Sequence, residues 1–269
     1  MRVAPYPLKP SFREKVWGVH DLQPWFPPTG QKIGEVWFLH PEGDPLPILV
    51  KFIFTSERLS VQVHPDDAYA LAHDGTLGKT EMWYILRAEP GAKLALGFRE
   101  PVSRTRAWEA ALSGEIEQLL RWFEVKPGQI FFIPPGTVHA LGEGIVLCEI
   151  QENTDITYRL YDYGRPRELH LDKALDVACL GPHPGPSVAQ GRILAACDYF
   201  VTEKLDLDSG TVYEPERDRF HLLVVLEGQG RWAGQEFRMG QVWMIPAAAE
   251  PFCIETDGAR LLKSYLPRK

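Results

Sequence analysis

Short apolar segments separated by Gly, Pro or Asp dominate the pattern of hydrophobic and polar positions along this chain of 269 residues. These segments run for five to eight residues, a length typical of β-strands, and several of them alternate between apolar and polar positions. The clearest examples are residues 47–54, 59–64, 82–86, 129–133 and 144–151. The pattern therefore predicts a mainly β protein.

Helical periodicity is confined to a few places. Residues 65–73 read as one or two turns, with Asp66 and Asp67 near the start, where acidic side chains complement the helix dipole. Residues 103–123 place apolar side chains at helical spacing and are interrupted near Gly114. A shorter helix is expected over residues 171–177. We therefore expect a small helical insertion, at about 103–123, in an otherwise β protein.

A linker and a short internal sequence repeat divide the chain. Residues 181–187, Gly-Pro-His-Pro-Gly-Pro-Ser, form the clearest linker, and the strand pattern resumes after it. Gly-Gln-Ile-Phe-Phe-Ile-Pro at 128–134 is echoed by Gly-Gln-Val-Trp-Met-Ile-Pro at 240–246. Two units of similar design fit two cupin-type jelly-roll barrels in tandem.

The two copies of the repeat differ in the residues on their C-terminal side. The first continues to His139, whereas the second has Pro251 at the matching place, and proline offers no ligand atom. We therefore expect a metal-binding catalytic domain over 1–180 and a second cupin-like domain without metal ligands over 188–269.

Composition and charge exclude some classes of function. The net charge is −7 and no block of Lys or Arg stands out, which argues against a nucleic-acid surface. No apolar run approaches the ~18 residues that span a bilayer, and the first ten residues lack the apolar segment of a secretory signal. The four cysteines are scattered. These features predict a cytoplasmic protein without nucleic-acid or membrane partners, and they leave the oligomeric state open.

Two histidines, a carboxylate and an amide carry the candidate chemistry. Gln62 and His64 lie in Gln-Val-His-Pro-Asp-Asp, Glu81 in Gly-Lys-Thr-Glu-Met-Trp-Tyr, and His139 in Pro-Pro-Gly-Thr-Val-His. Gln62 and His64 share one face of a strand, because strand side chains alternate. Each residue alone is more often a packing or surface residue. Together, however, buried His, Glu and His side chains are costly without a metal, and such a ligand set is typical of a catalytic divalent ion.

Lys79 and Ser60 flank these candidate ligands. Lys79 shares the strand face of Glu81 and could neutralise it or bind an anionic substrate group, although a solvated lysine at a strand end is equally consistent. Ser60 shares the face of Gln62 and could hydrogen-bond a phosphate, although a packed hydroxyl is the simpler interpretation.

A charged segment, residues 149–165, begins at the end of the apolar strand at 144–151. Within it, Arg159 has the forked donor geometry that suits a phosphate or an enediolate oxygen. Glu149 is a candidate base. On these residues alone, a salt-bridged loop is the better interpretation of the segment 149–165.

These segments resemble the type I mannose-6-phosphate isomerases in their short bacterial form. The similarity spans about residues 17–165 and rests on four motifs in the same order. They are Leu-Ser-Val-Gln-Val-His-Pro-Asp-Asp, Gly-Lys-Thr-Glu-x-Trp-Tyr, Pro-Pro-Gly-Thr-Val-His-Ala-Leu and Glu-Ile-Gln-Glu-Asn-Thr-Asp-x-Thr-Tyr-Arg-Leu-Tyr-Asp-Tyr-Gly-Arg. The resemblance implies a two-cupin fold and a zinc enzyme that interconverts mannose 6-phosphate and fructose 6-phosphate through a cis-enediol.

The resemblance also implies roles for individual residues. One Zn²⁺ per chain would be bound by Gln62, His64, Glu81 and His139. Catalytic roles would fall to Arg159, Glu149 and Lys79, and either Glu149 or a zinc-bound hydroxide could serve as the base. The sugar phosphate would be bound by Ser60, Lys79 and Arg159. The region 37–47 is shorter than is usual in the family, which bears on sugar specificity.

Two other classes of function remain open on the sequence. A bicupin metal dioxygenase could use a similar His, Glu and His ligand set, although Lys79, Arg159 and the polar segment 149–165 suit an anionic substrate better. A non-catalytic cupin that binds sugar phosphates is kept open by the short region 37–47.

Overall fold

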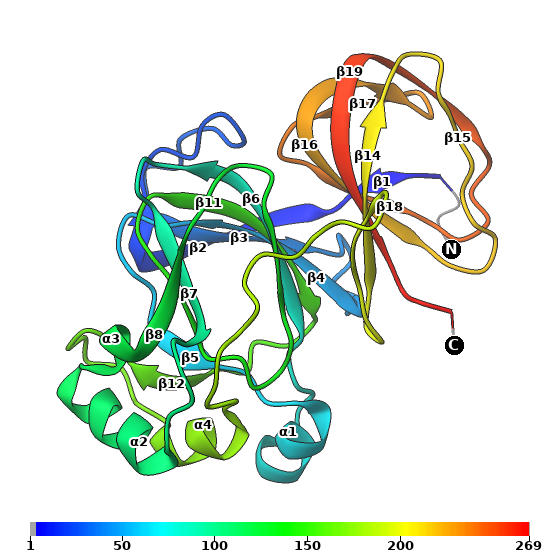
Figure 1. Ribbon diagram of the computed structural model, residues 1–269. Helices are drawn as coiled ribbons and strands as arrows, with labels where there is room; N and C mark the ends of the chain where they lie inside the picture. The colour runs from blue at the N-terminus through cyan, green and yellow to red at the C-terminus, as the bar shows by residue number, and fades with distance from the viewer. Residues whose placement is uncertain (1–3, 269) are drawn as a thin grey trace.

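The computed structural model describes residues 4–268, in which antiparallel strands form three sheets and short helices cluster at one end (Figure 1). The prediction of a mainly β protein is confirmed. The strand order of each sheet is open, so none of the three sheets is closed into a barrel. Within residues 4–268, no helix is long and apolar enough to cross a membrane.

The central six-stranded sheet has the strand order β2-β3-β4-β11-β6-β9. In that order its strands are Lys9–Val19, Ile33–Leu39, Ile48–Phe54, Ile145–Glu152, Glu81–Ala88 and Ile130–Ile133. Both faces of its central strands are buried, since every residue of β4 and of β11 is buried. A strand that is covered on both faces needs apolar residues at nearly every position, which explains the continuous apolar runs in the sequence.

The five-stranded sheet has the order β12-β5-β10-β7-β8. In that order its strands are Tyr158–Tyr161, Val61–Val63, His139–Leu141, Lys93–Phe98 and Leu120–Glu124. One face packs against the six-stranded sheet in a core that includes Leu96 and Trp83. These two sheets therefore form a sandwich, and polar side chains that point into it can meet from both sides.

The C-terminal sheet has the order β1-β18-β16-β19-β14-β13, with β15 paired to β19 and β17 paired to β16. Its strands are Tyr6–Pro7, Val242–Ile245, His221–Trp232, Phe252–Tyr265, Val201–Leu207, Ile193–Ala196, Val212–Tyr213 and Gln235–Arg238. A core that includes Phe52 and Val224 joins this sheet to the outer face of the six-stranded sheet. The first strand of the chain also pairs here, with Tyr6 opposite Met244.

The helices are α1 (Asp67–Asp74), α2 (Arg104–Ser113), α3 (Ile116–Leu119) and α4 (Leu171–Val177). The helices expected near 65–73 and 171–177 are present. The helical insertion expected at about 103–123 is shorter than predicted, because its last residues form β8. Gly114, with φ of +82°, ends α2 in the left-handed conformation that glycine adopts readily, and Leu120 then enters the sheet beside β7.

The two copies of the internal sequence repeat occupy corresponding positions in two different sheets. Ile133, at the end of the first copy, lies opposite Glu81 in the β6–β9 pair. Ile245, at the end of the second copy, lies opposite His221 in the β16–β18 pair. The second unit therefore has His221 where the first has Glu81.

On the neighbouring strands, the matching positions of the two units carry side chains of opposite charge. In the six-stranded sheet, Glu149 of β11 lies opposite Lys51 of β4. In the C-terminal sheet, the corresponding position on β19 holds Lys263, which lies opposite Glu203 of β14. The two units thus share a register but carry different polar side chains.

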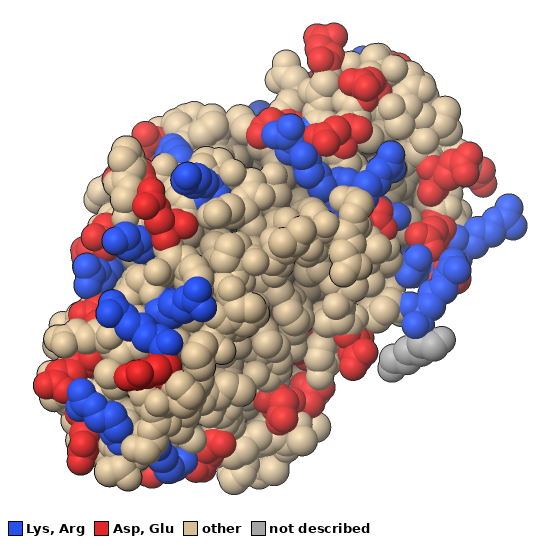
Figure 2. Space-filling model, viewed as in Figure 1, with Lys and Arg blue, Asp and Glu red and all other residues tan. Residues whose placement is uncertain are grey.

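Charged side chains of both signs are interspersed over the face of the molecule seen in Figure 2. The middle of this face is largely uncharged, and neither sign forms a continuous patch on it.

Candidate metal centre and substrate cavity

His64, Glu81 and His139 meet where three strands begin or end. His64 directly follows β5, whereas Glu81 opens β6 and His139 opens β10. Their potential ligand atoms all lie within 4.8 Å of one another. Each of the three side chains is only 1% exposed. Gln62 lies opposite His139 in the strand pair, with its Nε2 3.2 Å from the His139 Nε2. The structure therefore brings together the four side chains that the sequence pattern singled out.

Backbone carbonyl groups orient both imidazole rings. The Nδ1 of His64 lies 2.8 Å from the carbonyl oxygen of Ile156, and the Nδ1 of His139 lies 2.8 Å from that of Thr137. A carbonyl oxygen can only accept, so both Nδ1 atoms donate, and in the neutral rings Nε2 carries the free lone pair. Such outer contacts fix the tautomer and direction of metal-binding histidines.

Two buried atoms at the centre of the cluster have no hydrogen-bond partner. They are the Nε2 of His64 and the Oε1 of Glu81; the Glu81 Oε2 also makes no hydrogen bond, but it is paired with the Lys79 Nζ. The Glu81 Oε1 lies 3.7 Å from the His64 Nε2 and 3.5 Å from the His139 Nε2. Unpaired buried polar atoms are costly, and an ion with ligand distances of roughly 2.0–2.2 Å would satisfy both of them. The residues therefore fit a divalent metal ion.

The ionisation of these groups is also suited to metal binding. Burial lowers the pKa of His64 well below its usual value and lowers that of His139 to about 4, so both rings are neutral near pH 7. Burial and the nearby Glu149 raise the pKa of Glu81 to about 8. Without a metal, Glu81 therefore tends to hold a proton, which a bound cation would displace.

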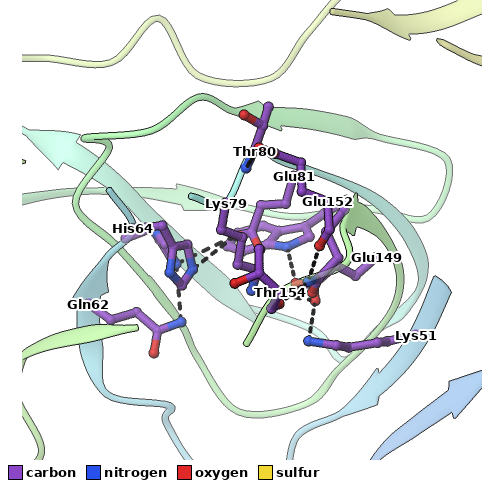
Figure 3. A network of polar contacts seen from close by, with 12 residues as sticks. Lys51, Gln62, His64, Lys79, Thr80, Glu81, Glu149, Glu152 and Thr154 are labelled. Atoms are coloured by element: carbon purple, nitrogen blue, oxygen red, sulfur yellow. Dashed lines mark hydrogen bonds and ion pairs between the residues drawn. The ribbon is translucent and has the colours of Figure 1, made fainter. Parts of the chain in front are cut away.

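A network of ion pairs lies beside the cluster (Figure 3). The Nζ of Lys79 is 2.8 Å from the Glu81 Oε2 and 3.8 Å from the Glu149 Oε1. The Nζ of Lys51 is 3.2 Å from that same Glu149 oxygen. The indole Nε1 of Trp83 donates to the other Glu149 oxygen at 2.9 Å. Both oxygens of Glu149 are therefore held by neighbouring side chains.

The register of the sheet produces this arrangement. Glu149 lies opposite Lys51 on one side and opposite Trp83 on the other, so all three side chains point into the sandwich. Burial alone would raise the pKa of Glu149, but Lys79 and Lys51 outweigh it and lower that pKa. Burial alone would lower the pKa of Lys79, but its acidic neighbours, Glu149 foremost, outweigh burial and raise that pKa. Glu149 and Lys79 are therefore both charged at neutral pH.

Arg159 and Ser60 approach from the five-stranded sheet. Arg159 lies on β12 opposite Gln62 of β5. Its Nη1 donates to the carbonyl oxygen of Glu168 at 2.8 Å, and its buried Nε has no partner. The hydroxyl of Ser60 donates to the Gln62 Oε1 at 3.1 Å.

A cavity of about 230 Å³ connects these groups. It is lined by six of the side chains expected at the site, namely Ser60, Gln62, Lys79, His139, Glu149 and Arg159. Other charged residues of its lining were not anticipated, namely Lys15, Glu35, Lys51, Asp155 and Arg167. Of these, Lys51 could have been recognised from the sequence as a buried charge that needs a partner. It is the single charged residue in the apolar segment 47–54, where the cost of burial calls for a partner.

Comparisons with known proteins agree with this architecture. Mannose-6-phosphate isomerase ManA of Bacillus subtilis is 33% identical over 95% of this chain and 97% of its own length. A solved structure of mannose 6-phosphate isomerase from Bacillus subtilis superposes with a TM-score of 0.86 at 30% identity, covering 97% of this chain and 99% of the other. A zinc-bound mannose 6-phosphate isomerase shares the fold with a TM-score of 0.78 at 16% identity, covering 98% and 100%. No family model matches the chain.

The fold and the site define a mainly β protein with a buried His, Glu and His centre beside a cavity rich in charged side chains. With a relative that is 33% identical along nearly its whole length, the chain belongs to the mannose-6-phosphate isomerase family.

Proposed function

We propose that this protein is a zinc-dependent isomerase that interconverts mannose 6-phosphate and fructose 6-phosphate. The observation that carries the proposal is the buried His64, Glu81 and His139 cluster beside the cavity, in a chain that belongs to this family. The charged side chains of the cavity suit an anionic sugar better than an apolar substrate.

One Zn²⁺ per chain would be held by His64, Glu81, His139 and Gln62. When bound, the ion would act as a Lewis acid toward substrate oxygens. The unpaired Nε2 of His64 and Oε1 of Glu81 support two of these ligands. Gln62 is the fourth, and rotation of its amide would present Oε1 in place of the Nε2 that now faces His139.

Arg159, Lys79 and Ser60 would bind and orient the sugar phosphate. The unpaired Nε of Arg159 is a buried donor at the cavity, and such a group gains most from an anionic partner. Lys79 is held in place by Glu81 and Glu149 and is charged at neutral pH. The cation of Arg159 would also stabilise negative charge that develops on the enediol oxygens.

Glu149 would transfer the proton between C2 and C1. It is ionised and both of its oxygens are fixed, by Lys51 and by Trp83, so it can accept a proton in one defined position. In the forward direction it would take the proton from C2 of the aldose and return a proton to C1, while the O2 hydroxyl proton is lost and O1 gains one. The carbonyl group thereby moves from C1 to C2.

We also propose the division of the chain into a metal-binding cupin-type unit over 1–180 and a second such unit over 188–269. The matching registers of Glu81 with Ile133 and of His221 with Ile245 support two related units. In the second unit Pro251 stands where the first has His139, which supports chemistry confined to the first.

An assay of purified protein tests the proposed function. Zinc-loaded protein is expected to convert mannose 6-phosphate to fructose 6-phosphate in a coupled assay, to lose activity on chelation and to regain it on addition of Zn²⁺. In D₂O the C2 hydrogen is expected to exchange with solvent. Zinc-loaded protein that turns over none of several aldose 6-phosphates would overturn the proposal, and oxygen uptake by an iron-loaded sample would favour a dioxygenase instead.

A further inference from the structure

The carboxylate of Asp67 connects the C-terminal sheet to the candidate metal centre. Its Oδ1 accepts a hydrogen bond from the backbone N–H of Gly78 at 2.7 Å. Its Oδ2 accepts a hydrogen bond from the hydroxyl of Tyr199 at 3.0 Å. Tyr199 lies between β13 and β14, in the part of the chain beyond the linker. One carboxylate therefore contacts both halves of the molecule.

Gly78 begins the short segment that carries two residues of the site. Lys79 is the next residue and Glu81 lies two positions further on, whereas His64 precedes Asp67 by three residues. The segment between His64 and Glu81 is closed on itself, since the N–H of Lys79 donates to the carbonyl of Pro65 at 3.0 Å. The position of Lys79 and Glu81 relative to His64 therefore depends on the contacts between the two ends of this segment.

Two carboxylates hold the N–H groups on either side of Lys79. Asp67 holds that of Gly78, and Glu152 holds that of Thr80 at 2.6 Å. Among residues 4–268, no hydrogen bond other than that from Tyr199 to Asp67 joins the part after the linker to the segment 65–81. Tyr199, Glu152 and Leu77 also line a cavity of about 840 Å³ at the junction of the two halves.

We propose that Tyr199 is a positioning residue for the metal centre. It orients the Asp67 carboxylate, which fixes Gly78 and thereby the backbone that carries Lys79 and Glu81. The inference rests on the proposed function, because it takes Glu81 as a metal ligand and Lys79 as a substrate-binding group. It assigns the C-terminal half a part in shaping the site of the first half, beyond covering one face of its sheet.

The variant Tyr199→Phe removes only the hydroxyl and tests this role. Tyr213→Phe is a matched control, because that tyrosine also lies in the C-terminal half and its hydroxyl bonds to the His221 Nδ1 at 2.7 Å. Zinc affinity is measured by competition with a chromogenic chelator. Outer contacts of metal ligands typically contribute about 10–100-fold in affinity, and for this more remote hydroxyl we expect a loss of about 3–10-fold in Tyr199→Phe. Tyr213→Phe is expected to bind zinc as the unchanged protein does.

A double-mutant cycle separates positioning from general packing. If Tyr199 acts through Asp67, then Tyr199→Phe adds no further loss of zinc affinity in an Asp67→Ala background. Asp67→Asn keeps the Oδ1 acceptor for Gly78 and can donate to the Tyr199 oxygen, so it should restore much of the affinity that Asp67→Ala loses. Steady-state kinetics of Tyr199→Phe should show a fall in kcat that exceeds any change in KM.

Two outcomes would overturn the inference. One is unchanged zinc affinity in Tyr199→Phe, and the other is an additive loss in the double variant. Because zinc affinity is measured without turnover, the experiment can contradict either of the two proposals without contradicting the other. A parent protein that binds zinc without isomerising sugars would contradict the proposed function alone, whereas an active parent with an unaffected Tyr199→Phe variant would contradict the positioning role alone.

Discussion

Lys51 and Glu149 form a buried cross-strand ion pair in the centre of the six-stranded sheet, with 3.2 Å between the Nζ and the carboxylate. The two side chains are only 3% and 4% exposed. The Lys51 ammonium also lies 4.5 Å from the ring centroid of Trp37, on the next strand. One row of side chains across the sheet therefore holds the carboxylate that we propose as the base.

Removal of one charge from this pair is expected to be costly. Breaking a buried ion pair leaves an uncompensated charge, so Lys51→Met should lower the free energy of unfolding by about 3 kcal/mol. The double variant Lys51→Met, Glu149→Gln should recover about half of that loss, because no unpaired carboxylate remains. Urea unfolding of the metal-loaded proteins measures both values.

The exposed pair of Lys32 and Glu57, with 3.0 Å between Nζ and Oε1, provides the control. Lys32→Met should cost less than about 1 kcal/mol, since solvent screens exposed pairs. Equal costs for the two lysine variants would contradict a buried role for Lys51.

Replacement of Arg159 tests its catalytic role apart from metal binding. Loss of a charged group that stabilises the transition state typically lowers kcat by about 10²–10³-fold, and we expect this range for Arg159→Ala. Zinc content should stay at one ion per chain, because the guanidinium is not among the proposed ligands. Arg106→Ala, at an exposed pair with Glu115, should leave both quantities unchanged. Near-normal kcat in the metal-loaded Arg159→Ala protein would rule out the proposed role.

Zinc binding is expected to release a proton at neutral pH. In the metal-free protein, burial and the nearby Glu149 raise the pKa of Glu81 to about 8, so this carboxyl tends to hold a proton at pH 7. A metal ligand must be deprotonated, so the apparent zinc affinity should rise with pH up to about 8 and then level off. The histidines contribute nothing to this trend near pH 7, because their pKa values are lowered and both rings are already neutral.

Calorimetry in two buffers of different ionisation enthalpy checks this release. The observed binding enthalpy should depend on the buffer at pH 7 and lose that dependence at pH 9. An enthalpy that is independent of the buffer at pH 7 would mean that Glu81 is already ionised without the metal.

The convergence of the candidate metal ligands was easier to predict from the sequence than the side chains around them, for a physical reason. Gln62 and His64 are two residues apart in a strand, so alternation alone places them on one face, and the motif containing His139 was recognisable as a unit. The pairing of Lys51 with Glu149 depends on the register of strands 98 residues apart in the chain. No local pattern specifies that register. Lys51 appeared only as an isolated charge in an apolar run.

The end of the helical insertion and the pairing of the first strand were harder to predict for a similar reason. Residues 120–123 have a helical spacing of apolar side chains, but the partner strand β7 draws them into a sheet. Tyr6 and Pro7 pair with β18 more than 230 residues later, so the first strand joins the C-terminal sheet. The hydrogen bond from Tyr199 to Asp67 likewise spans 132 residues. Tertiary contacts of this kind override local preference.

Gly78 offers the sharpest test of how the metal centre is held together. A Cβ at this position would lie 2.4 Å from the carbonyl carbon of Asp66 and 2.6 Å from both the backbone nitrogen of Asp67 and the carbonyl oxygen of Pro65. These are backbone atoms and cannot yield as a flexible side chain does. Gly78→Ala should therefore push apart the two ends of the segment between His64 and Glu81.

The expected result is a loss of zinc affinity of about 10-fold or more in Gly78→Ala, measured by chelator competition. Gly75→Ala is the matched control, since Gly75 ends α1 with φ of +67° and has open space around it. Strain in the left-handed region should cost that control about 1 kcal/mol in unfolding free energy without altering zinc binding. If both alanine variants bound zinc as the parent does, the close contact at Gly78 would not govern the geometry of Glu81. If both lost affinity equally, the cause would be general destabilisation of the segment. Of the two added methyl groups, that at Gly78 would meet the backbone next to His64, whereas that at Gly75 would meet open space.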